Sequence, residues 1–197
     1  MCRLIETIQV YNGTVLHGEY HLRRIYESRK NLLGCTDTLD LDSVLEIPQK
    51  FSEGRVKCRV IYDRVIHDAT FSYYTPLPVK NLKLVYSDAI EYSYKYENRE
   101  EINRLRSQRG LCDEILIVKH ERITDTSFSN VAFFEGNKWI TPANPLLEGT
   151  CRQRLLDNNI LTEGDITVSD VPSYTHVSLI NSMLQLHDDL IPIDKIT

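Results

Sequence analysis

The sequence predicts a mixed α/β (α+β) protein built from two lobes. Apolar alternation and helical spacing both occur in each half of the chain, which indicates strands and helices in both. The length of 197 residues corresponds to one large or two small domains. Pro76 and Pro78 interrupt the pattern between the halves, because proline cannot pair inside a central strand. We therefore expect an N-terminal α/β lobe over residues 1–78 and a C-terminal lobe over residues 79–197.

The N-terminal lobe opens with a predicted strand at residues 4–10, where apolar residues partly alternate. Asn12-Gly13 is a strong hairpin signal, with Val15 and Leu16 in the returning strand. A helix follows, ended by Gly34 at the C-cap position. Its apolar residues have helical spacing: Leu22, Ile25, Tyr26, Leu32 and Leu33. The rest of the lobe is expected to hold a second helix at 41–51 and strands at 56–62 and 69–74.

The C-terminal lobe begins with a predicted strand at residues 82–86. The polar stretch 97–109 favours a helix that Gly110 would end. Three apolar strands are expected next, at 114–118, 130–134 and 138–141. A helix at 151–156 and a buried strand at 176–180 complete the lobe.

Composition and charge exclude several classes of protein. The net charge of −5 and the pI near 5.7 argue against a basic nucleic-acid footprint. No apolar run approaches the roughly 20 residues of a membrane span, and the first residues do not have the pattern of a signal peptide. The five cysteines include no CxxC pair, so we expect reduced thiols in a cytoplasmic protein and no metal site.

The turn at residues 146–152 is a candidate phosphate site. Gly149 precedes a helix start, and the unpaired N–H groups of a helix N-terminus bind phosphate through hydrogen bonds and the macrodipole. An ordinary junction between a loop and a helix would have the same sequence.

Two further polar segments are candidate site residues. Residues 123–130 combine one carboxylate, four hydroxyls and an amide, which suit a phosphorylated heterocycle or simply cap a turn. Lys95 lies among Tyr92, Tyr94 and Tyr96, where desolvation would lower the pKa of its amine and make it a nucleophile. A solvated surface lysine is the alternative.

In chain order, Lys95, the 125–130 cluster and the 147–152 turn resemble the signature of class IV, or fold-type IV, pyridoxal-phosphate (PLP) enzymes. This family includes D-amino-acid aminotransferase, branched-chain aminotransferase and 4-amino-4-deoxychorismate lyase. Glu6-Thr7, Asn12-Gly13 and His21-Leu22-Arg23-Arg24 are similar to the family's opening strand, hairpin and helix. The resemblance covers nearly the whole chain. It implies the two-lobed fold of the D-amino-acid aminotransferase type, PLP as cofactor and a homodimer.

The resemblance also implies roles for residues that contact the reacting part of the cofactor. Lys95 matches the catalytic lysine that binds PLP covalently. Asp125 occupies the place of the family's glutamate, which faces the pyridine nitrogen and keeps it protonated, so that the ring accepts electrons. Because Asp125 is one methylene shorter, its contact with the ring is expected to be longer or mediated by water.

Other residues match the family's phosphate and cofactor contacts. Arg24 matches the arginine that grips the phosphate, and the backbone N–H groups of Thr150 and Cys151 are expected to cap it. Ser129 and Asn130 lie in the cofactor-binding strand. Cys151 replaces a threonine that is common in the family. The chain also starts later than is usual there, and we expect a changed substrate pocket as a result.

Two local patterns bear on the reaction. Residues 95–99 are similar to the K-x-x-N-R of aminodeoxychorismate lyases, and residues 179–183 are similar to the lyases' asparagine-containing segment. We therefore expect a lyase that releases pyruvate and 4-aminobenzoate, as in folate biosynthesis. An aminotransferase acting on D- or branched-chain amino acids remains the alternative, because D-amino-acid aminotransferases share the K-x-x-N spacing. A degenerate, non-catalytic member is a further alternative, and the intact Lys95 argues against it.

An amino-acid-like substrate carries carboxylates, which arginine binds in a bidentate manner. Arg59 and Arg64 flank the strand that leads toward the family's substrate pocket, so both are candidates, with surface salt bridges as the alternative. Tyr94 is a candidate for lining the pocket, although strand alternation turns at least one of the three neighbouring tyrosines outward.

Overall fold

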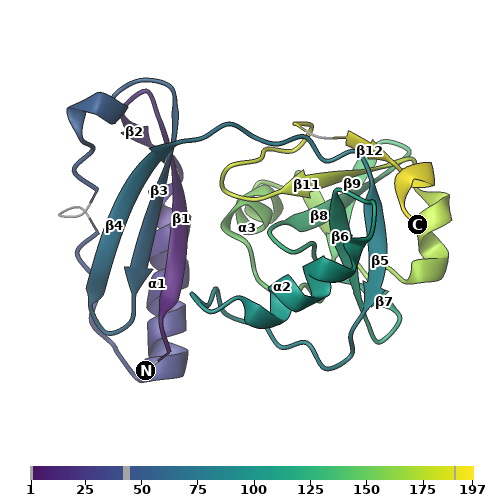
Figure 1. Cartoon of the computed structure of the whole chain (residues 1–197), viewed down its shortest axis with the longest axis horizontal. Helices are drawn as coiled ribbons and strands as arrows, with labels where there is room; N and C mark the ends of the chain where they lie inside the picture. Colours follow the sequence, from purple (N-terminus) through teal and green to yellow (C-terminus); the bar gives the residue numbers. More distant parts are fainter. Residues whose placement is uncertain (1, 42–44, 189) are drawn as a thin grey trace. The chain divides into compact units, whose positions relative to one another are not determined.

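The structure, a computed structural model, describes residues 2–41, 45–188 and 190–197. Its contacts divide the chain into two units, which are coloured along the sequence in Figure 1. The first unit consists of Met1–Pro76 and Tyr94–Asn98, and the second of Leu77–Ser93 and Arg99–Thr197. No helix within the described residues is both long and apolar enough to cross a membrane.

The division differs from the expected one at Lys95. We expected a boundary between residues 78 and 79, with Lys95 in the C-terminal lobe, whereas the segment that carries Lys95 groups with the first unit. The reason is a backbone hydrogen bond of 2.9 Å from the N–H of Ile5 to the carbonyl of Lys95.

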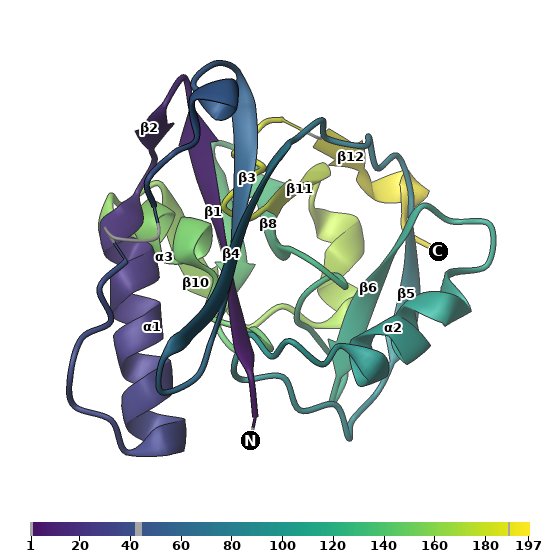
Figure 2. The ribbon, with the colours of Figure 1, turned by 60° about the vertical axis from the view of Figure 1, so that its left-hand side comes forward.

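The first unit is a four-stranded antiparallel sheet with one helix. The strand order is β2-β1-β3-β4, with the bounds Thr14–Val15, Leu4–Tyr11, Arg55–Tyr62 and Ile66–Tyr73. Buried and half-buried residues alternate along β3, as expected for a strand with one face in a core. Helix α1 (Gly18–Leu33) runs along the sheet in Figure 2 and packs Ile25 against the buried face.

Two local signals in the sequence specify this unit's turns. Asn12 and Gly13 have positive φ angles of 47° and 75°, which the tight hairpin between β1 and β2 requires. Gly34 ends α1 in the left-handed region at φ 65°, and its N–H bonds to the carbonyls of Arg29 and Lys30.

The helix expected at residues 41–51 is wrong for the part that the structure describes; residues 42–44 lie outside it. Only Gln49–Phe51 form a short 3-10 helix, labelled η1, because Pro48 stands in the middle of the expected helix and cannot donate a helical hydrogen bond. The apolar side chains are nevertheless used, since Leu41 belongs to the core beside β1 and β3, and Leu45 and Phe51 pack against it.

The second unit contains two sheets. A five-stranded sheet has the order β10-β9-β8-β11-β12, with the bounds Leu161–Gly164, Lys138–Pro142, Asn130–Glu135, His176–Ile180 and Leu190–Pro192. A three-stranded sheet has the order β5-β6-β7, with the bounds Leu82–Tyr86, Glu114–Lys119 and Arg122–Ile123. Strands β5 and β6 are parallel, and β6 is buried along almost its whole length.

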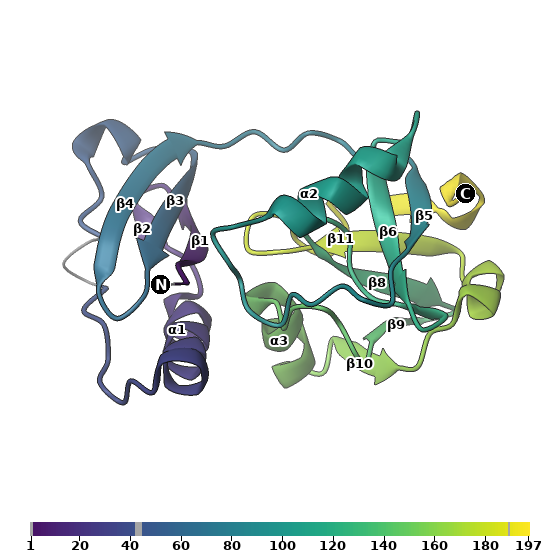
Figure 3. The same cartoon turned by 60° about the horizontal axis from the view of Figure 1, so that its bottom comes forward.

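Helices cover the outer faces of these sheets, as Figure 3 shows for α2 beside β6. The two sheets share one core, to which Leu116 and Phe133 belong. Helix α2 (Glu100–Arg106) packs Ile102 and Leu105 on the other face of the three-stranded sheet. Helix α3 (Thr150–Asp157) packs Leu155 against the five-stranded sheet. Three 3-10 helices complete the unit, η2 at Ser107–Arg109, η3 at Val168–Ser173 and η4 at Ile193–Lys195.

Candidate active site

In the first unit, a buried ion-pair network surrounds Arg24. Nε of Arg24 donates to Oε1 of Glu6 at 2.8 Å, and Nη2 donates to Oε2 at 2.6 Å. Nδ1 of His21 lies 2.6 Å from the same Oε2. Burial would raise the pKa of Glu6, but the positive charge of Arg24 and the hydrogen bond from His21 outweigh it, and the pKa falls to about 2. The sequence motif contained Glu6 and His21, yet it assigned them no role.

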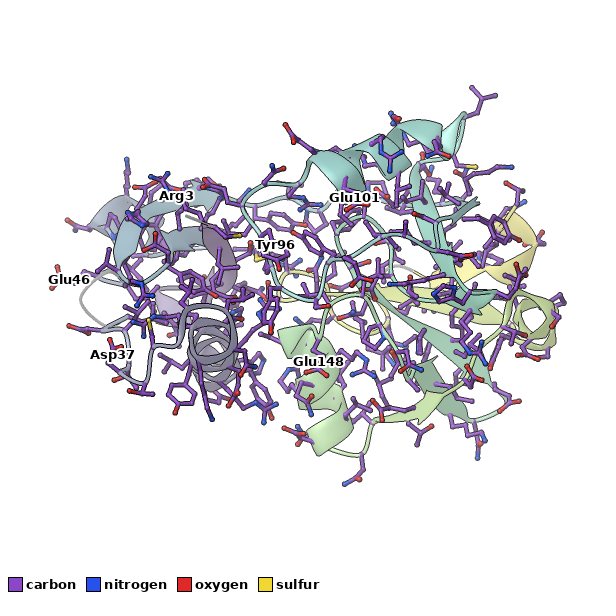
Figure 4. The ribbon with its side chains drawn as sticks, turned by 90° about the horizontal axis from the view of Figure 1, so that it is seen from below. Arg3, Asp37, Glu46, Tyr96, Glu101 and Glu148 are labelled. Carbon is purple, nitrogen blue, oxygen red and sulfur yellow. The ribbon has the colours of Figure 1, made fainter. Side chains whose placement is uncertain are left out.

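The Lys95 segment extends the edge of β1. Besides the hydrogen bond from Ile5 to Lys95, the N–H of Glu97 donates to the carbonyl of Arg3 at 2.9 Å. The rings of Tyr94 and Tyr96, the latter labelled in Figure 4, contact each other edge to face with centroids 6.1 Å apart. The N–H of Tyr96 donates to the carbonyl of Tyr94 at 2.9 Å, so the backbone forms a tight three-residue turn centred on Lys95.

The two candidate substrate arginines have different surroundings. Nη2 of Arg59, a half-buried side chain on β3, lies 3.5 Å from Oε1 of Glu97. Nη2 of Arg64 donates to the carbonyl of Leu33 at 2.9 Å, and Nη1 lies 3.6 Å from Sγ of Cys35. A cation at this position satisfies a carbonyl at the C-terminus of α1 and its dipole.

In the second unit, Asp125 and Asn130 join two loops. Oδ1 of Asp125 accepts a hydrogen bond from Nδ2 of Asn130 at 2.8 Å, and Oδ2 accepts one from the N–H of Leu147 at 2.9 Å. Nδ2 of Asn130 also donates to the carbonyl of Leu147 at 2.8 Å. Burial raises the pKa of Asp125 to about 6, although both hydrogen bonds lower it. The carboxyl group thus holds the loop before α3 against the start of β8.

Ser129 lies in a closed polar turn that precedes β8. Its N–H donates to Oγ1 of Thr126 at 2.9 Å, and the two hydroxyl oxygens are 2.7 Å apart. Two charged residues hold this turn from outside: Arg99, the last residue of the K-x-x-N-R pattern, and Glu114, which no sequence motif singled out. Nη2 of Arg99 donates to the carbonyl of Ser127 at 2.5 Å, and Oε1 of the fully buried Glu114 accepts the N–H of Ser127 at 3.4 Å. The sequence did contain a signal for Glu114, because a glutamate stands there at the start of an apolar strand.

The N-terminus of α3 has no side-chain cap. Gly149 is its N-cap residue. A β-carbon at Gly149 would collide with Oδ1 of Asn130, so this position requires glycine. Thr150 and Cys151 are both buried. Backbone N–H groups and a hydroxyl at a helix N-terminus form a donor set that fits the phosphate of PLP.

The side chains of Cys151 and Arg152 anchor this helix and are not part of the donor set. Sγ of Cys151 lies 3.9 Å from the carbonyl of Leu184, and burial raises the pKa of its thiol. Nη2 of the buried Arg152 donates to the carbonyl of Pro142 at 2.9 Å and to Glu163 at 2.5 Å. Glu148, in the turn before the helix, is labelled in Figure 4.

Comparison with protein families decides the family. The model of the family described as amino-transferase class IV matches residues 3–188. The chain belongs to this family. Class IV members are PLP-dependent enzymes, so the expected family, enzyme class and cofactor are confirmed at this level.

Individual class IV relatives have similar lengths. An uncharacterised protein of Haemophilus influenzae is 34% identical over 185 residues, which cover 93% of this chain and 98% of the relative. A Haemophilus somnus structure, provisionally named a 4-amino-4-deoxychorismate lyase, is 31% identical with a TM-score of 0.82 and covers 94% of this chain and 98% of its own. A Mesorhizobium loti structure, provisionally named an amino-acid aminotransferase, is 25% identical with a TM-score of 0.81. The match covers 100% of this chain and 99% of the M. loti chain.

A more distant structure shows the class IV fold with cofactor. It is the PLP-bound form of an aminotransferase from Mycobacterium tuberculosis, 16% identical with a TM-score of 0.79, and covers 98% of this chain and 81% of its own. These likenesses confirm the predicted mixed α/β fold of the class IV type.

Within the described residues, no group of three or more His, Cys, Asp or Glu side chains is arranged to hold a metal ion.

Proposed function

We propose that this class IV enzyme is a PLP-dependent lyase that acts on 4-amino-4-deoxychorismate and releases pyruvate and 4-aminobenzoate. PLP supplies the electron sink for the substrate's Cα carbanion. The product would place the enzyme in folate biosynthesis.

The observation that carries the choice of a lyase is the arrangement around Asn181. The sequence 179–183 is similar to the lyases' asparagine-containing segment. Oδ1 of Asn181 accepts the N–H groups of Met183 and Leu184 at 2.7 and 2.9 Å, and Nδ2 donates to the carbonyl of Phe128 at 3.3 Å. This single amide therefore joins the turn after β11 to the polar turn that contains Ser129. A Gly/Thr/Ser-rich turn, as in aminotransferases, has no equivalent amide.

The K-x-x-N-R pattern and one relative support the same choice. Arg99, the last residue of that pattern, donates to the carbonyl of Ser127 in the polar turn. The H. somnus relative with a lyase name is 31% identical over almost the full length of both chains. Aminotransferase activity is the second candidate, supported by the M. loti relative.

The residues divide the work as follows in this proposal. Lys95 binds PLP covalently and moves the proton at the substrate's Cα. Arg24 and the N–H groups of Thr150 and Cys151 bind the phosphate. Asp125 faces the ring nitrogen, and because each carboxylate oxygen accepts more than one hydrogen bond, its bonds to neighbouring groups do not prevent this.

Further residues support the pocket. Ser129 and Asn130 shape the turn beside Asp125. Arg59, Arg64 and Tyr94 are proposed for the substrate side, and of these Arg59 suits the role best. Its guanidinium lies 3.5 Å from the carboxylate of Glu97, and solvent-accessible pairs of this kind contribute only about 0–1 kcal/mol. Arg64 is less suited, because it already donates a hydrogen bond to the carbonyl of Leu33 at the end of α1.

The proposed working form is a homodimer in the cytoplasm. Support for the location comes from the five cysteines, all of which are free thiols. Light scattering of the purified protein tests the dimer, which a monomeric mass would contradict.

The decisive experiment compares substrates on one preparation. The purified protein with PLP is incubated with 4-amino-4-deoxychorismate, and 4-aminobenzoate and pyruvate are measured in equal amounts. The same protein is tested with pyruvate or 2-oxoglutarate and a panel of D- and L-amino acids. Lys95→Ala is the control for both assays. Transamination without 4-aminobenzoate release would establish the second candidate, and inactivity in both assays of a PLP-loaded protein would refute the proposed substrate.

A further inference from the structure

Glu6 is a carboxylate placed inside an apolar core. It lies on β1 between Leu4 and Ile8 on the same face of the sheet, and its cross-strand partner is Val60. All three neighbours belong to the core cluster of the first unit. The Glu6 side chain has no solvent exposure. Burying a charge in this way is costly unless it is paired and hydrogen-bonded.

Both partners of Glu6 come from one face of α1. His21 and Arg24 are three residues apart, which places them side by side on the helix. Two parallel hydrogen bonds, from Nε and Nη2 of Arg24, fix the plane of the guanidinium group. Because Glu6 with its low pKa is ionised and only accepts, the hydrogen lies on Nδ1 of His21, and this N–H donates a hydrogen bond to Oε2.

This network does more than a structural fastening requires. Replacing buried ion pairs with packed apolar groups is often neutral or stabilising, so the attachment of α1 to the sheet does not by itself require a carboxylate at position 6. Glu6 holds the Nε–Nη2 edge of the Arg24 guanidinium. The Arg24 side chain is 14% exposed, whereas its partners Glu6 and His21 are 2% exposed or less.

We propose that Glu6 and His21 are positioning residues that hold Arg24 ready for the cofactor's phosphate. The inference rests on the proposed role of Arg24. Glu6 fixes the guanidinium plane, and His21 fixes Glu6. The arginine then loses little side-chain freedom when phosphate binds, and this preorganisation strengthens binding.

The test separates phosphate recognition from folding. Full-length protein freed of cofactor is titrated with PLP and, separately, with pyridoxal, which has no phosphate. Glu6→Gln replaces one carboxylate oxygen with an NH2 group, which cannot accept the hydrogen bonds that Arg24 and His21 donate. We expect its affinity for PLP to fall about tenfold to hundredfold, while its affinity for pyridoxal stays within about twofold of wild type. A structural defect would lower both affinities equally and would overturn the proposal.

A double-mutant cycle tests whether Glu6 acts through Arg24. Arg24→Ala should weaken PLP binding by a similar factor, and adding Glu6→Gln to it should cause no further loss. Independent, additive losses would overturn the positioning role. Arg23→Ala is the matched control, because it removes a cation one residue away whose guanidinium lies 5.3 Å from the ring centre of Tyr20. It should leave both affinities unchanged.

A second pair of variants keeps the proposal falsifiable if Glu6→Gln does not fold. His21→Asn keeps an N–H donor near Oε2 of Glu6, whereas His21→Leu removes it. PLP affinity should be higher in His21→Asn than in His21→Leu, with pyridoxal affinity equal in both. Equal PLP affinities would overturn the role of His21. If the wild type binds PLP and Arg24→Ala weakens it but Glu6→Gln does not, only the positioning role fails. If the wild type binds no PLP, the proposed function fails with it.

Discussion

Gly149 and Asn130 are in direct contact, and the contact leaves no room for a β-carbon. Cγ of Asn130 would lie 3.1 Å from such an atom, and Oδ1 would lie nearer still. Asn130 cannot turn away easily, because its Nδ2 donates both to Asp125 and to the carbonyl of Leu147. The start of α3 and the start of β8 are therefore fixed to each other by a glycine and an amide.

Gly149→Ala is accordingly expected to destabilise the protein. Forcing a methyl group into this packed contact should lower the free energy of unfolding by about 1–3 kcal/mol, and it should also weaken PLP binding. Urea denaturation and PLP titration measure the two effects. Gly18→Ala is the control, because its β-carbon would lie an ordinary 3.5 Å from Val15 in the first turn of α1. Equal stability of the two variants would contradict this account of Gly149.

Lys95 should be the residue that reacts with PLP. Borohydride reduction of the yellow, PLP-loaded protein followed by peptide mapping should find the label on Lys95. Lys95→Ala should be colourless and inactive, yet it should keep the fold, since the backbone carbonyl that binds Ile5 remains. A label on the exposed Lys83, or on Lys119, whose Nζ bonds to the carbonyl of Ile90 at 2.8 Å, would refute the assignment.

Asp125 should make the cofactor-free protein more stable as the pH falls from 7 to 4. Its folded-state pKa of about 6 lies above its ordinary value of 3.8, so between these values the folded state binds more protons than the unfolded state. The stability contributed by protonation is present at pH 4 and is lost as the pH rises through 6. Relative to Asp125→Asn, which does not titrate, the wild type should gain about 2 kcal/mol over this range. If the stability difference between the wild type and Asp125→Asn did not change with pH, burial would not raise the pKa of Asp125.

Glu6 should have the opposite effect in more acidic solution. Its pKa falls from 4.5 to about 2 on folding, so the unfolded state binds more protons between these values. The stability contributed by the ionised form is present above pH 4.5 and is lost as the pH falls toward 2. Relative to Glu6→Gln, the wild type should lose about 3 kcal/mol over this interval. Glu53→Gln, at an exposed position, is the control. If the stability difference between the wild type and Glu6→Gln stayed constant over this interval, the network with Arg24 would not be formed in solution.

Local signals in the sequence predicted most of the fold. Asn12-Gly13 and Gly34 act through their own φ angles, so the hairpin and the end of α1 could be placed without knowledge of distant partners. Outside residues 42–44, the expected helix at 41–51 failed because Pro48 interrupts it and its apolar side chains pack in or against the core instead. Short strands such as β7 and β10 were not predicted, since two to four residues become a strand only through pairing with distant ones.

The site was predictable as a set of motifs but not as a network. The sequence singled out Asp125, Asn130 and the turn at 147–152, and the structure brings these together within the second unit. It could not show that Glu6 would bind Arg24, eighteen residues away. Such pairings depend on the angle at which a helix crosses a sheet, which local spacing does not encode.

Because Tyr94–Asn98 belongs to the first unit, the chain cannot be divided after Pro76 into two parts that each contain a whole unit. A fragment ending at Pro76 would leave the N–H of Ile5 without its carbonyl and would expose that edge of β1, and unpaired strand edges invite aggregation. The complementary fragment would carry Lys95 away from the strand that holds it. Co-expressed fragments should therefore fold only by associating, and a break in the 75–80 linker would make two chains of one protein rather than two proteins.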